Sequence, residues 1–228
     1  AGAAAVITDG NSGSPGNNIA IRSNSFTAIG EPAVYTSNDD GTTINWLITD
    51  NKIDGVTGTD NSGIWLLGLS DSTISDNQIS DTAYAGMILD LLKNVNVSGN
   101  LISDTPRKGI QVANSPDSKV VIRNNTITNT NTLNFTDEGA ITIYPNVANI
   151  RIEHNNLIAN YQGFTVRNKP GVVASDIRVN ENNIHGNEVY GVANFAQGGG
   201  ILNAENNWWG SENGPTHNIN LLADIGDG

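Results

Sequence analysis

Four groups of residues that could carry out acid–base chemistry stand at equivalent places in the chain. Each group lies one or two residues before a glycine that starts an apolar run. The groups are Tyr84, Arg107-Lys108, Asp137-Glu138 and Tyr161. Arginine and lysine could neutralise the carboxylate of an acidic sugar while a tyrosine delivers a proton. If the protein is an enzyme, its catalytic residues would therefore be Tyr84, Arg107, Lys108 and Tyr161. The simpler interpretation, which we favour, is a row of solvated bends with incidental salt bridges.

The segments that position these residues repeat along the chain. An aliphatic residue, two spacers, an asparagine, one spacer and an apolar residue recur about every 26 residues. The asparagines are Asn24, Asn51, Asn77, Asn100, Asn125, Asn155, Asn182 and Asn207. A glycine-led run falls between them, as in Gly63-Ile64-Trp65-Leu66. Three short strands per unit predict a parallel β-helix of about eight coils, in which each strand pairs with its equivalent one turn on.

The repeated asparagine predicts a ladder. The bend after the second strand needs a residue that tolerates the left-handed region, and asparagine is among the few that do. Stacked carboxamides can also hydrogen-bond from coil to coil. We therefore expect one all-β domain over residues 1–209, with an incomplete leading coil at 1–17. Residues 210–228 would form a cap or linker.

The repeat units resemble the right-handed parallel β-helix repeat of the pectin-lyase-like superfamily, across roughly residues 18–209. The ending Glu205-Asn206-Asn207-Trp208-Trp209-Gly210, followed by Asn213-Gly214-Pro215-Thr216, is similar to endings of prokaryotic secreted and cell-surface β-helix proteins. The resemblance implies an extracellular or cell-surface location. It leaves the activity open, because the superfamily contains polysaccharide lyases, hydrolases, uronan epimerases, phage tailspikes and non-catalytic proteins.

Outward positions on the Gly-led strands can be assigned by alternation. The first column is Val34, Trp65, Ile88, Gln111, Thr142, Thr165 and Ala193, and the second is Thr36, Leu67, Asp90, Ala113, Tyr144, Arg167 and Phe195. An exposed apolar strip of Trp65, Leu67 and Ile88 would be a contact surface. Together with Asp90, Tyr144 and Arg167 these are the candidate binding residues. Asp90 and Arg167 lie three coils apart, about 14 Å, which is too far for one catalytic site.

Composition excludes several classes of partner and site. The net charge of −12 argues against nucleic acid and against insertion into an anionic membrane. The absence of cysteine removes disulfides and thiolate metal sites. We expect His154, His185 and His217 to lie too far apart to hold a metal. Asp76, Asp81 and Asp104 could bind calcium but lack a recognised ligand spacing, so no cofactor is expected.

These observations favour a non-catalytic extracellular module, a structural, filament or surface-layer subunit with glycan binding as a further expectation. The alternative is a polysaccharide lyase or uronan epimerase that acts on an acidic polysaccharide. A β-helix has unpaired strand edges at both ends. The uncharged start, Ala1–Ile7, offers little to cover one of them. We therefore expect an adjoining domain, or further copies stacked end to end, to cover the ends.

Overall fold

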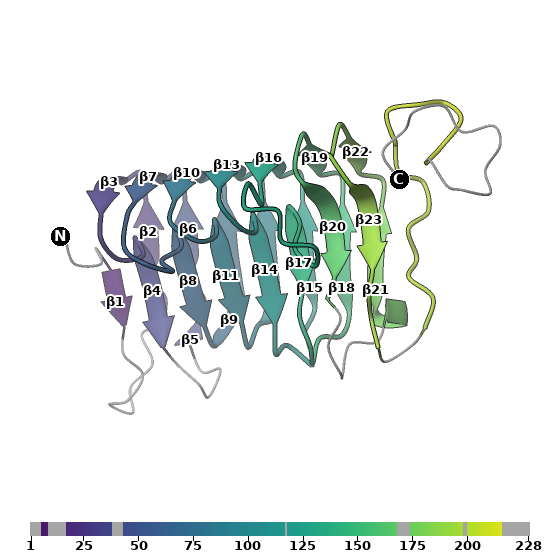
Figure 1. Cartoon of the computed structure of the whole chain (residues 1–228). Coiled ribbons are helices and arrows are strands. Elements are labelled where there is room, and N and C mark those ends of the chain that lie inside the picture. The colour runs from purple at the N-terminus through teal and green to yellow at the C-terminus, as the bar shows by residue number, and fades with distance from the viewer. Residues whose placement is uncertain are drawn as a thin grey trace.

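The chain winds into a rod of parallel strands, with β1 at one end and β23 at the other (Figure 1). A computed structural model describes residues 6–8, 17–37, 43–116, 118–167, 174–197 and 200–215. The strands form three sheets of eight, seven and eight strands, and neighbouring strands within each sheet are parallel. The predicted all-β parallel β-helix is therefore confirmed.

The Gly-led sheet runs the length of the rod. Its strands, in spatial order, are β1 (Val6–Thr8), β4 (Val34–Ser37), β8 (Ile64–Leu67), β11 (Met87–Asp90), β14 (Ile110–Ala113), β17 (Ile141–Ile143), β20 (Gln162–Val166) and β23 (Tyr190–Asn194). Each strand stacks on its equivalent one coil on, so a side chain keeps its place in the unit from coil to coil.

The other two sheets complete each coil. The second sheet consists of β2 (Ala20–Arg22), β5 (Thr43–Ile44), β6 (Leu47–Thr49), β9 (Leu69–Ser75), β12 (Lys93–Ser98), β15 (Val120–Arg123), β18 (Ile150–Glu153) and β21 (Ile177–Asn180). The third consists of β3 (Ser25–Ile29), β7 (Lys52–Val56), β10 (Gln78–Thr82), β13 (Leu101–Thr105), β16 (Thr126–Thr130), β19 (Asn156–Ile158) and β22 (Asn183–His185). Among the described residues the one helical element is a 3-10 turn, η2 (Ala174–Asp176). No helix in these ranges is long and apolar enough to cross a membrane.

The coil count is slightly lower than the eight that the asparagine spacing predicted. The eighth unit forms only the isolated bridges Arg178–Asn203 and Asn183–Trp208 instead of full strands. Residues 216–228 and most of the leading segment lie outside the described residues, so the predicted cap and leading coil stay predictions.

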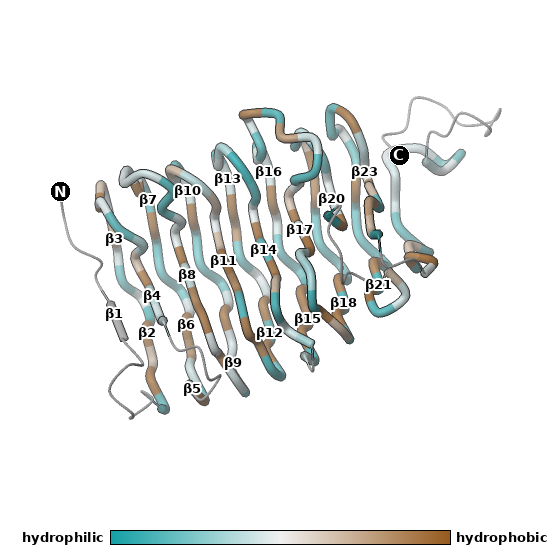
Figure 2. Tube along the Cα trace, turned by 60° about the horizontal axis from the view of Figure 1, so that its bottom comes forward, coloured by the Kyte–Doolittle hydropathy of each residue, from teal (hydrophilic) through white to brown (hydrophobic). Residues whose placement is uncertain are grey.

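The core is a stack of aliphatic side chains from all three sheets. Equivalent positions pair in register, as in Ile53–Ile79–Ile102 of the third sheet, and all three are buried. Figure 2 shows hydrophobic and hydrophilic stretches recurring at corresponding places along successive coils. Apolar burial of this kind is the main stabilising force. The repeat therefore fixes the core as well as the backbone.

The asparagine ladder is continuous through all eight predicted residues. Each Nδ2 donates to the Oδ1 of the asparagine one coil on, at 2.9–3.0 Å in all seven steps. The same Oδ1 accepts a backbone N–H, as in Asn77 N to Asn100 Oδ1 at 3.0 Å. The Nδ2 of Asn100 also donates to the carbonyl of Ile74 at 3.0 Å. The buried carboxamides therefore satisfy one another and the bend.

The predicted reason for the asparagine was wrong in one respect. The left-handed residue at this bend is the one before each ladder asparagine. These residues are Ser23, Asp50, Asp76, Gly99, Asn124, His154, Glu181 and Asn206, with φ between 54° and 68°. Their side chains vary, whereas the next position is always asparagine. Asparagine is thus required for its two-sided hydrogen bonding and not for its backbone conformation.

A shorter ladder, which the sequence analysis missed, lies at the end of the third sheet. Asn160 Nδ2 donates to Asn187 Oδ1 at 3.2 Å, and Thr130 Oγ1 donates to Asn160 Oδ1 at 2.9 Å. Asn160 and Asn187 follow the left-handed residues Ala159 and Gly186. This second bend, at the end of the third sheet, therefore follows the same pattern in its last two coils: a left-handed residue is followed by an asparagine that bonds to the neighbouring coil.

The first coil departs from the predicted outward columns. Tyr35 pairs with Trp65 and Ser37 with Leu67, so these two residues face outward in place of Val34 and Thr36. Val34 and Thr36 are buried. The predicted alternation of inward and outward residues began one residue too early in β4. A shift of one residue exchanges the two faces of a strand.

The tryptophan inside the coils and those at the end of the rod differ in burial. Trp46 is buried. Trp209 is only partly buried and packs against the core from the incomplete last unit. Trp208 is 51% exposed beside the last ladder asparagine. The end of the rod is therefore less enclosed than the spacing predicted.

Candidate functional site

The site begins with an insertion between β16 and β17, residues 131–138, which we call the overhang. Asn131 is fully buried and organises it: its Nδ2 donates to the carbonyls of Phe135 (2.7 Å) and Glu138 (2.6 Å), and its Oδ1 accepts the N–H of Phe135 (2.8 Å). The backbone N–H groups of Asn131 and Leu133 donate to Arg107 and Pro106 in the coil before. The overhang is thereby fixed, with Asp137 and Glu138 at its end.

Glu138 is the centre of a charged network over the Gly-led sheet. Its side chain is fully buried. Arg107 forms a two-pronged contact with it, Nε to Oε2 at 2.8 Å and Nη2 to Oε1 at 2.5 Å. Lys108 Nζ lies 3.0 Å from Oε1, and the Tyr144 hydroxyl donates to the same oxygen at 3.2 Å. We call Tyr84, Arg107, Lys108, Glu138, Tyr144 and Arg167 the Glu138 network.

The three cations of the network also donate hydrogen bonds to tyrosine hydroxyl groups and to Asp137. The hydroxyl of Tyr84 accepts from Arg107 Nη1 at 3.0 Å and from Lys108 Nζ at 3.1 Å. Arg167 donates to the Tyr144 hydroxyl and to Asp137, with Nε 2.6 Å from Asp137 Oδ2. All three cations therefore have acidic or hydroxyl partners.

Aromatic rings lie against these cations, on two sides of Arg107 and Lys108 and on one side of Arg167. The guanidinium of Arg107 lies 4.0 Å from the ring centre of Phe135 and 4.7 Å from that of Tyr84. Lys108 Nζ lies 4.4 Å from the Tyr84 ring, and Arg167 lies 4.6 Å from the Tyr144 ring. These distances are within the range of cation–π attraction, which strengthens where water is excluded.

Burial and charge set the protonation states. Burial is the largest influence on Tyr144 and raises the pKa of its hydroxyl, so the phenol stays neutral. Burial by itself would lower the pKa of Arg107, but Glu138 outweighs it and the pKa is raised. The pKa of Arg167 is likewise raised, because Tyr144 and Asp137 outweigh its burial. Three cations face Asp137 and Glu138, so the assembly carries one net positive charge.

The sequence interpretation of these residues as solvated bends was wrong. The side chains of Lys108 and Glu138 are 0% exposed, and those of Arg107 and Arg167 are 22% and 16% exposed. Surface salt bridges contribute little, but removing one partner of a buried pair costs several kcal/mol. The network therefore ties the overhang to the sheet.

Beside the network, the overhang forms one wall of an open groove of ≈ 500 Å³, which we call the aromatic groove. It is lined by Thr136, Asp137, Tyr161, Gln162, Val189, Tyr190 and Phe195. Tyr190 is 43% exposed and packs edge-on to Phe195, with ring centres 6.4 Å apart. Gln162 is buried and donates to the carbonyl of Thr136 at 2.8 Å, which holds the wall in place.

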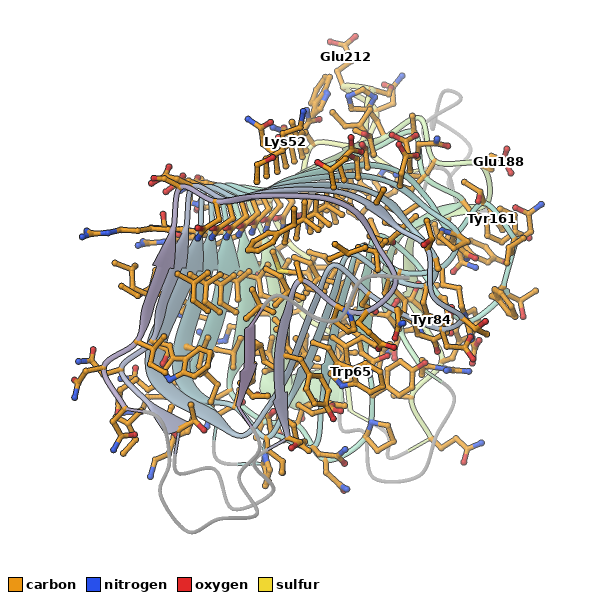
Figure 3. The ribbon with its side chains drawn as sticks, turned by 90° about the vertical axis from the view of Figure 1, so that its left-hand side faces the viewer. Lys52, Trp65, Tyr84, Tyr161, Glu188 and Glu212 are labelled. Carbon is orange, nitrogen blue, oxygen red and sulfur yellow. The ribbon has the colours of Figure 1, made fainter. Side chains whose placement is uncertain are left out.

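The structure divides the predicted catalytic group. Tyr84, Arg107 and Lys108 lie in the Glu138 network, whereas Tyr161 lines the aromatic groove. Figure 3, which looks along the rod from its N-terminal end, places Tyr84, Tyr161 and Trp65 on the same side, with Lys52 elsewhere on the coil. Two of the predicted binding residues, Tyr144 and Arg167, join the network.

The remaining predicted binding residues do not form an exposed strip. Ile88 is only 4% exposed, which contradicts the prediction for that residue. Trp65 and Leu67 are half-buried, and Trp65 packs edge-on to Tyr35 with ring centres 5.9 Å apart. The outward face of a sheet is here covered by its own large side chains, which alternation alone does not reveal.

Asp90 is chemically unusual for this face. Its Oδ1 is buried and has no hydrogen-bond partner among the described residues. Burial raises the pKa of its carboxyl group to about 6. Asp90 lies in β11 and Arg167 directly follows β20, three strands further along the sheet, so the two stay apart as predicted.

The histidines lie at bends. His154 is left-handed and contacts Glu181 at 2.9 Å on the surface, and His185 ends β22. His217 lies outside the described residues. Within the described ranges, no three histidine, aspartate or glutamate side chains are grouped to hold a metal ion.

Two residues of the site were missed by the sequence analysis for different reasons. Tyr190 directly precedes Gly191, just as Lys108 precedes Gly109, so the same signal could have found it. Asn131 has no equivalent in other units, and no pattern could have marked it.

The fold and the site can now be set beside known families. A family model described as the right-handed β-helix region matches residues 2–148, which is more than half of the chain. The chain belongs to this right-handed β-helix family. No curated protein and no solved structure matches it significantly. The ladder continues with the same geometry to Asn207, well past the matched residues.

Proposed function

We propose that this right-handed β-helix protein is a non-catalytic extracellular module that binds a glycan in the aromatic groove. The observation that carries the proposal is the engagement of the acid–base groups. Lys108 Nζ contacts Glu138 and the Tyr84 hydroxyl, and both Lys108 and Glu138 are fully buried. A lyase or epimerase needs a base that can reach its substrate. A buried lysine with two partners is better suited to hold the overhang.

The composition of the groove supports glycan binding. Tyr161, Tyr190 and Phe195 offer ring faces and edges against which the apolar side of a sugar can pack. Asp137 and the backbone of the overhang add acceptors for hydroxyl groups. The groove is walled by the overhang, which the Glu138 network holds, so its shape is set before a ligand arrives. Such preorganisation lowers the entropic cost of binding.

Glycan-affinity measurements test this function. Tyr161→Ala and Tyr190→Ala should each weaken binding to the best ligand of a glycan array by about five- to thirtyfold, the equivalent of roughly 1–2 kcal/mol per ring. Tyr35→Ala is the matched control, because Tyr35 is a half-buried tyrosine of the same sheet outside the groove. No binding to any glycan, or equal loss in the control, would count against the proposal.

The alternative is a polysaccharide lyase or uronan epimerase, with Arg107 and Arg167 as its strongest support. Both guanidinium groups keep some exposure, and the network together with Asp137 has one excess positive charge that could meet a uronate. Incubation with alginate, pectate and glycosaminoglycans, followed by ultraviolet detection of unsaturated product, screens for a lyase. Proton exchange with solvent at C5 screens for an epimerase. Turnover that Arg107→Ala abolishes in a folded protein would replace the binding function with catalysis.

We further propose that the ends of the rod meet an adjoining domain or another copy. Each ladder Nδ2 donates toward the C-terminal end, so the two ends of the rod differ and would stack head to tail. The net charge of −12 opposes self-association at low salt. Sedimentation velocity should therefore show larger species as salt or calcium increases. A monomer at high concentration in both conditions leaves only the adjoining domain.

A further inference from the structure

A second charged surface lies away from the groove, on the outward face of the second sheet. Arg151 of β18 and Arg178 of β21 pair in register, so their side chains leave the sheet one strand spacing apart, about 4.8 Å. Val121 of β15 precedes them in the same column, and Lys119 lies two residues before it. All three basic residues are exposed.

None of these three cations forms an ion pair with any residue that the structure describes. This distinguishes them from Arg107, Lys108 and Arg167, each of which has an acidic partner. Two guanidinium groups in register repel each other, and nearby acids would ordinarily offset that cost. An unpaired stack of this kind is more readily explained by an external anion than by a role in folding.

The surface around them is hollowed. Lys119, Arg151 and Arg178 line a hollow of ≈ 540 Å³, together with Asp176 as its one acidic residue. Three cations against one carboxylate give the hollow a local charge of +2. Arg151 and Arg178 also line a neighbouring hollow that contains Glu153, Glu181 and Glu205. Glu153 is in register with Arg123 of β15, and Glu181 contacts His154. The acidic charge nearest the site is thus partly offset.

The net charge of the whole protein does not decide binding at this hollow. Charges more than about 8–10 Å apart are largely screened at physiological ionic strength, so the nearby groups dominate. Guanidinium groups bind planar or tetrahedral oxyanions through paired N–H donors. Two of them, spaced along the rod axis, suit a chain that carries anionic groups at intervals.

We propose that Lys119, Arg151 and Arg178 form a binding site for the carboxylate or sulfate groups of an acidic polysaccharide. The site lies on a different sheet from the aromatic groove and does not depend on the function proposed for it. The excess of negative charge on the rest of the protein disfavours long nucleic acids, which would extend over that surface. A polysaccharide segment that occupies the hollow alone avoids this repulsion.

The test measures affinity by calorimetry in about 50 mM salt, with a sulfated oligosaccharide, an oligogalacturonate and inorganic sulfate as separate probes. Arg151→Glu and Arg178→Glu should each lower the affinity for one of the two oligosaccharides at least tenfold, and raising the salt should weaken wild-type binding. The matched control is Arg22→Glu, which makes the same charge change at an exposed arginine of β2, near the other end of the same sheet. Its effect should be less than twofold.

Several results would overturn the proposal. These are no binding of either oligosaccharide, an equal loss in Arg22→Glu, or tighter binding of single-stranded DNA of matched charge. A loss caused by Tyr190→Ala but not by Arg151→Glu would move the ligand to the aromatic groove. Conversely, a clear effect of Arg151→Glu with no effect of the groove variants would support this site and show that the same ligand does not use the groove. Inorganic sulfate separates affinity for the anionic group from affinity for the sugar chain.

Discussion

The asparagine ladder and the Glu138 network are both buried polar assemblies, but they are built on opposite principles. The ladder is neutral, and every step uses the same residue with the same two-sided bonding. The network is charged, occurs once, and joins residues from four coils and an insertion. A neutral repeated assembly spreads its stabilisation along the rod. A charged single assembly concentrates it where one loop must be held, and removing one member leaves its partners buried and unpaired.

The largest effect should come from Glu138→Ala. The substitution leaves the buried ammonium of Lys108 and the guanidinium of Arg107 without their shared carboxylate, so we expect a loss of about 3–5 kcal/mol in the free energy of unfolding. Urea denaturation followed by circular dichroism measures it. Glu188→Ala, at an exposed glutamate, is the control and should change stability by less than about 0.5 kcal/mol. Adding Lys108→Met to Glu138→Ala should restore part of the loss. A cost below about 1 kcal/mol would mean that the network is incidental.

The ladder should be more sensitive in its middle than at its end. Asn100→Ala removes the acceptor of the Asn77 side chain and backbone N–H, and the donor to Asn125, all of them buried. Leaving these groups unsatisfied should cost about 2–4 kcal/mol. Asn24→Ala removes one bond at the exposed end of the ladder and should cost about 1 kcal/mol. Equal losses at the two positions in urea denaturation would contradict the ladder as a cooperative stack.

Asp90 tests the cost of burying a charge without a partner. Its folded pKa of about 6 lies above the ordinary value of 3.8, so its contribution to stability is fully present below about pH 4 and is lost as the pH rises through 6. At pH 7 the ionised carboxylate should cost about 2 kcal/mol, allowing for partial exposure. Asp90→Asn should therefore be more stable than the wild type at pH 7 and similar to it near pH 4. A stability difference that stays constant between these pH values would show that Asp90 is not the titrating group.

The smallest effect concerns the second bend, where two coils use different residues in one conformation. Ala159 and Gly186 occupy successive left-handed positions, with φ of 55° and 66°. Ala159→Gly should stabilise the protein by about 0.5–1 kcal/mol, and Gly186→Ala should destabilise it by a similar amount. A Cβ at Gly186 would meet only ordinary contacts at 3.6–4.0 Å, so the cost would be conformational and not steric. Thermal melts of both variants measure it, and shifts of the same sign would refute the explanation.

The features of the ladder that repeat were predictable, and those that depend on local geometry were not. Spacing identified all eight asparagines because in-register parallel pairing carries each position to its equivalent one coil on. It did not identify which residue takes the left-handed conformation, because Ser23, His154 and Glu181 have no shared sequence signal for that conformation. The slip at Val34 and Thr36 has the same origin, since Ala33 stands where the next unit has Gly63, the residue that marks the start of the strand.

For the candidate site, the sequence analysis singled out Tyr84, Arg107, Lys108, Tyr144 and Arg167 but assigned them to two separate groups. Their meeting depends on Asn131, which fixes the overhang and brings Glu138 over the sheet. Asn131 belongs to no repeat. Neither the burial of Lys108 nor the separation of Tyr161 from the network could be inferred without knowing where that loop lies.

The sequence by itself determined the parallel β-helix, its ladder and its core, because each unit contacts chiefly the next and the contact is set by the spacing of residue types. Only the tertiary structure decided which charges are buried together and which are left unpaired on the surface. Arg107 and Arg151 are alike in sequence, yet one lies beneath an insertion beside a carboxylate and the other on an open sheet. That difference depends on the path of a non-repeating loop and on the exclusion of water beneath it, and residue spacing encodes neither.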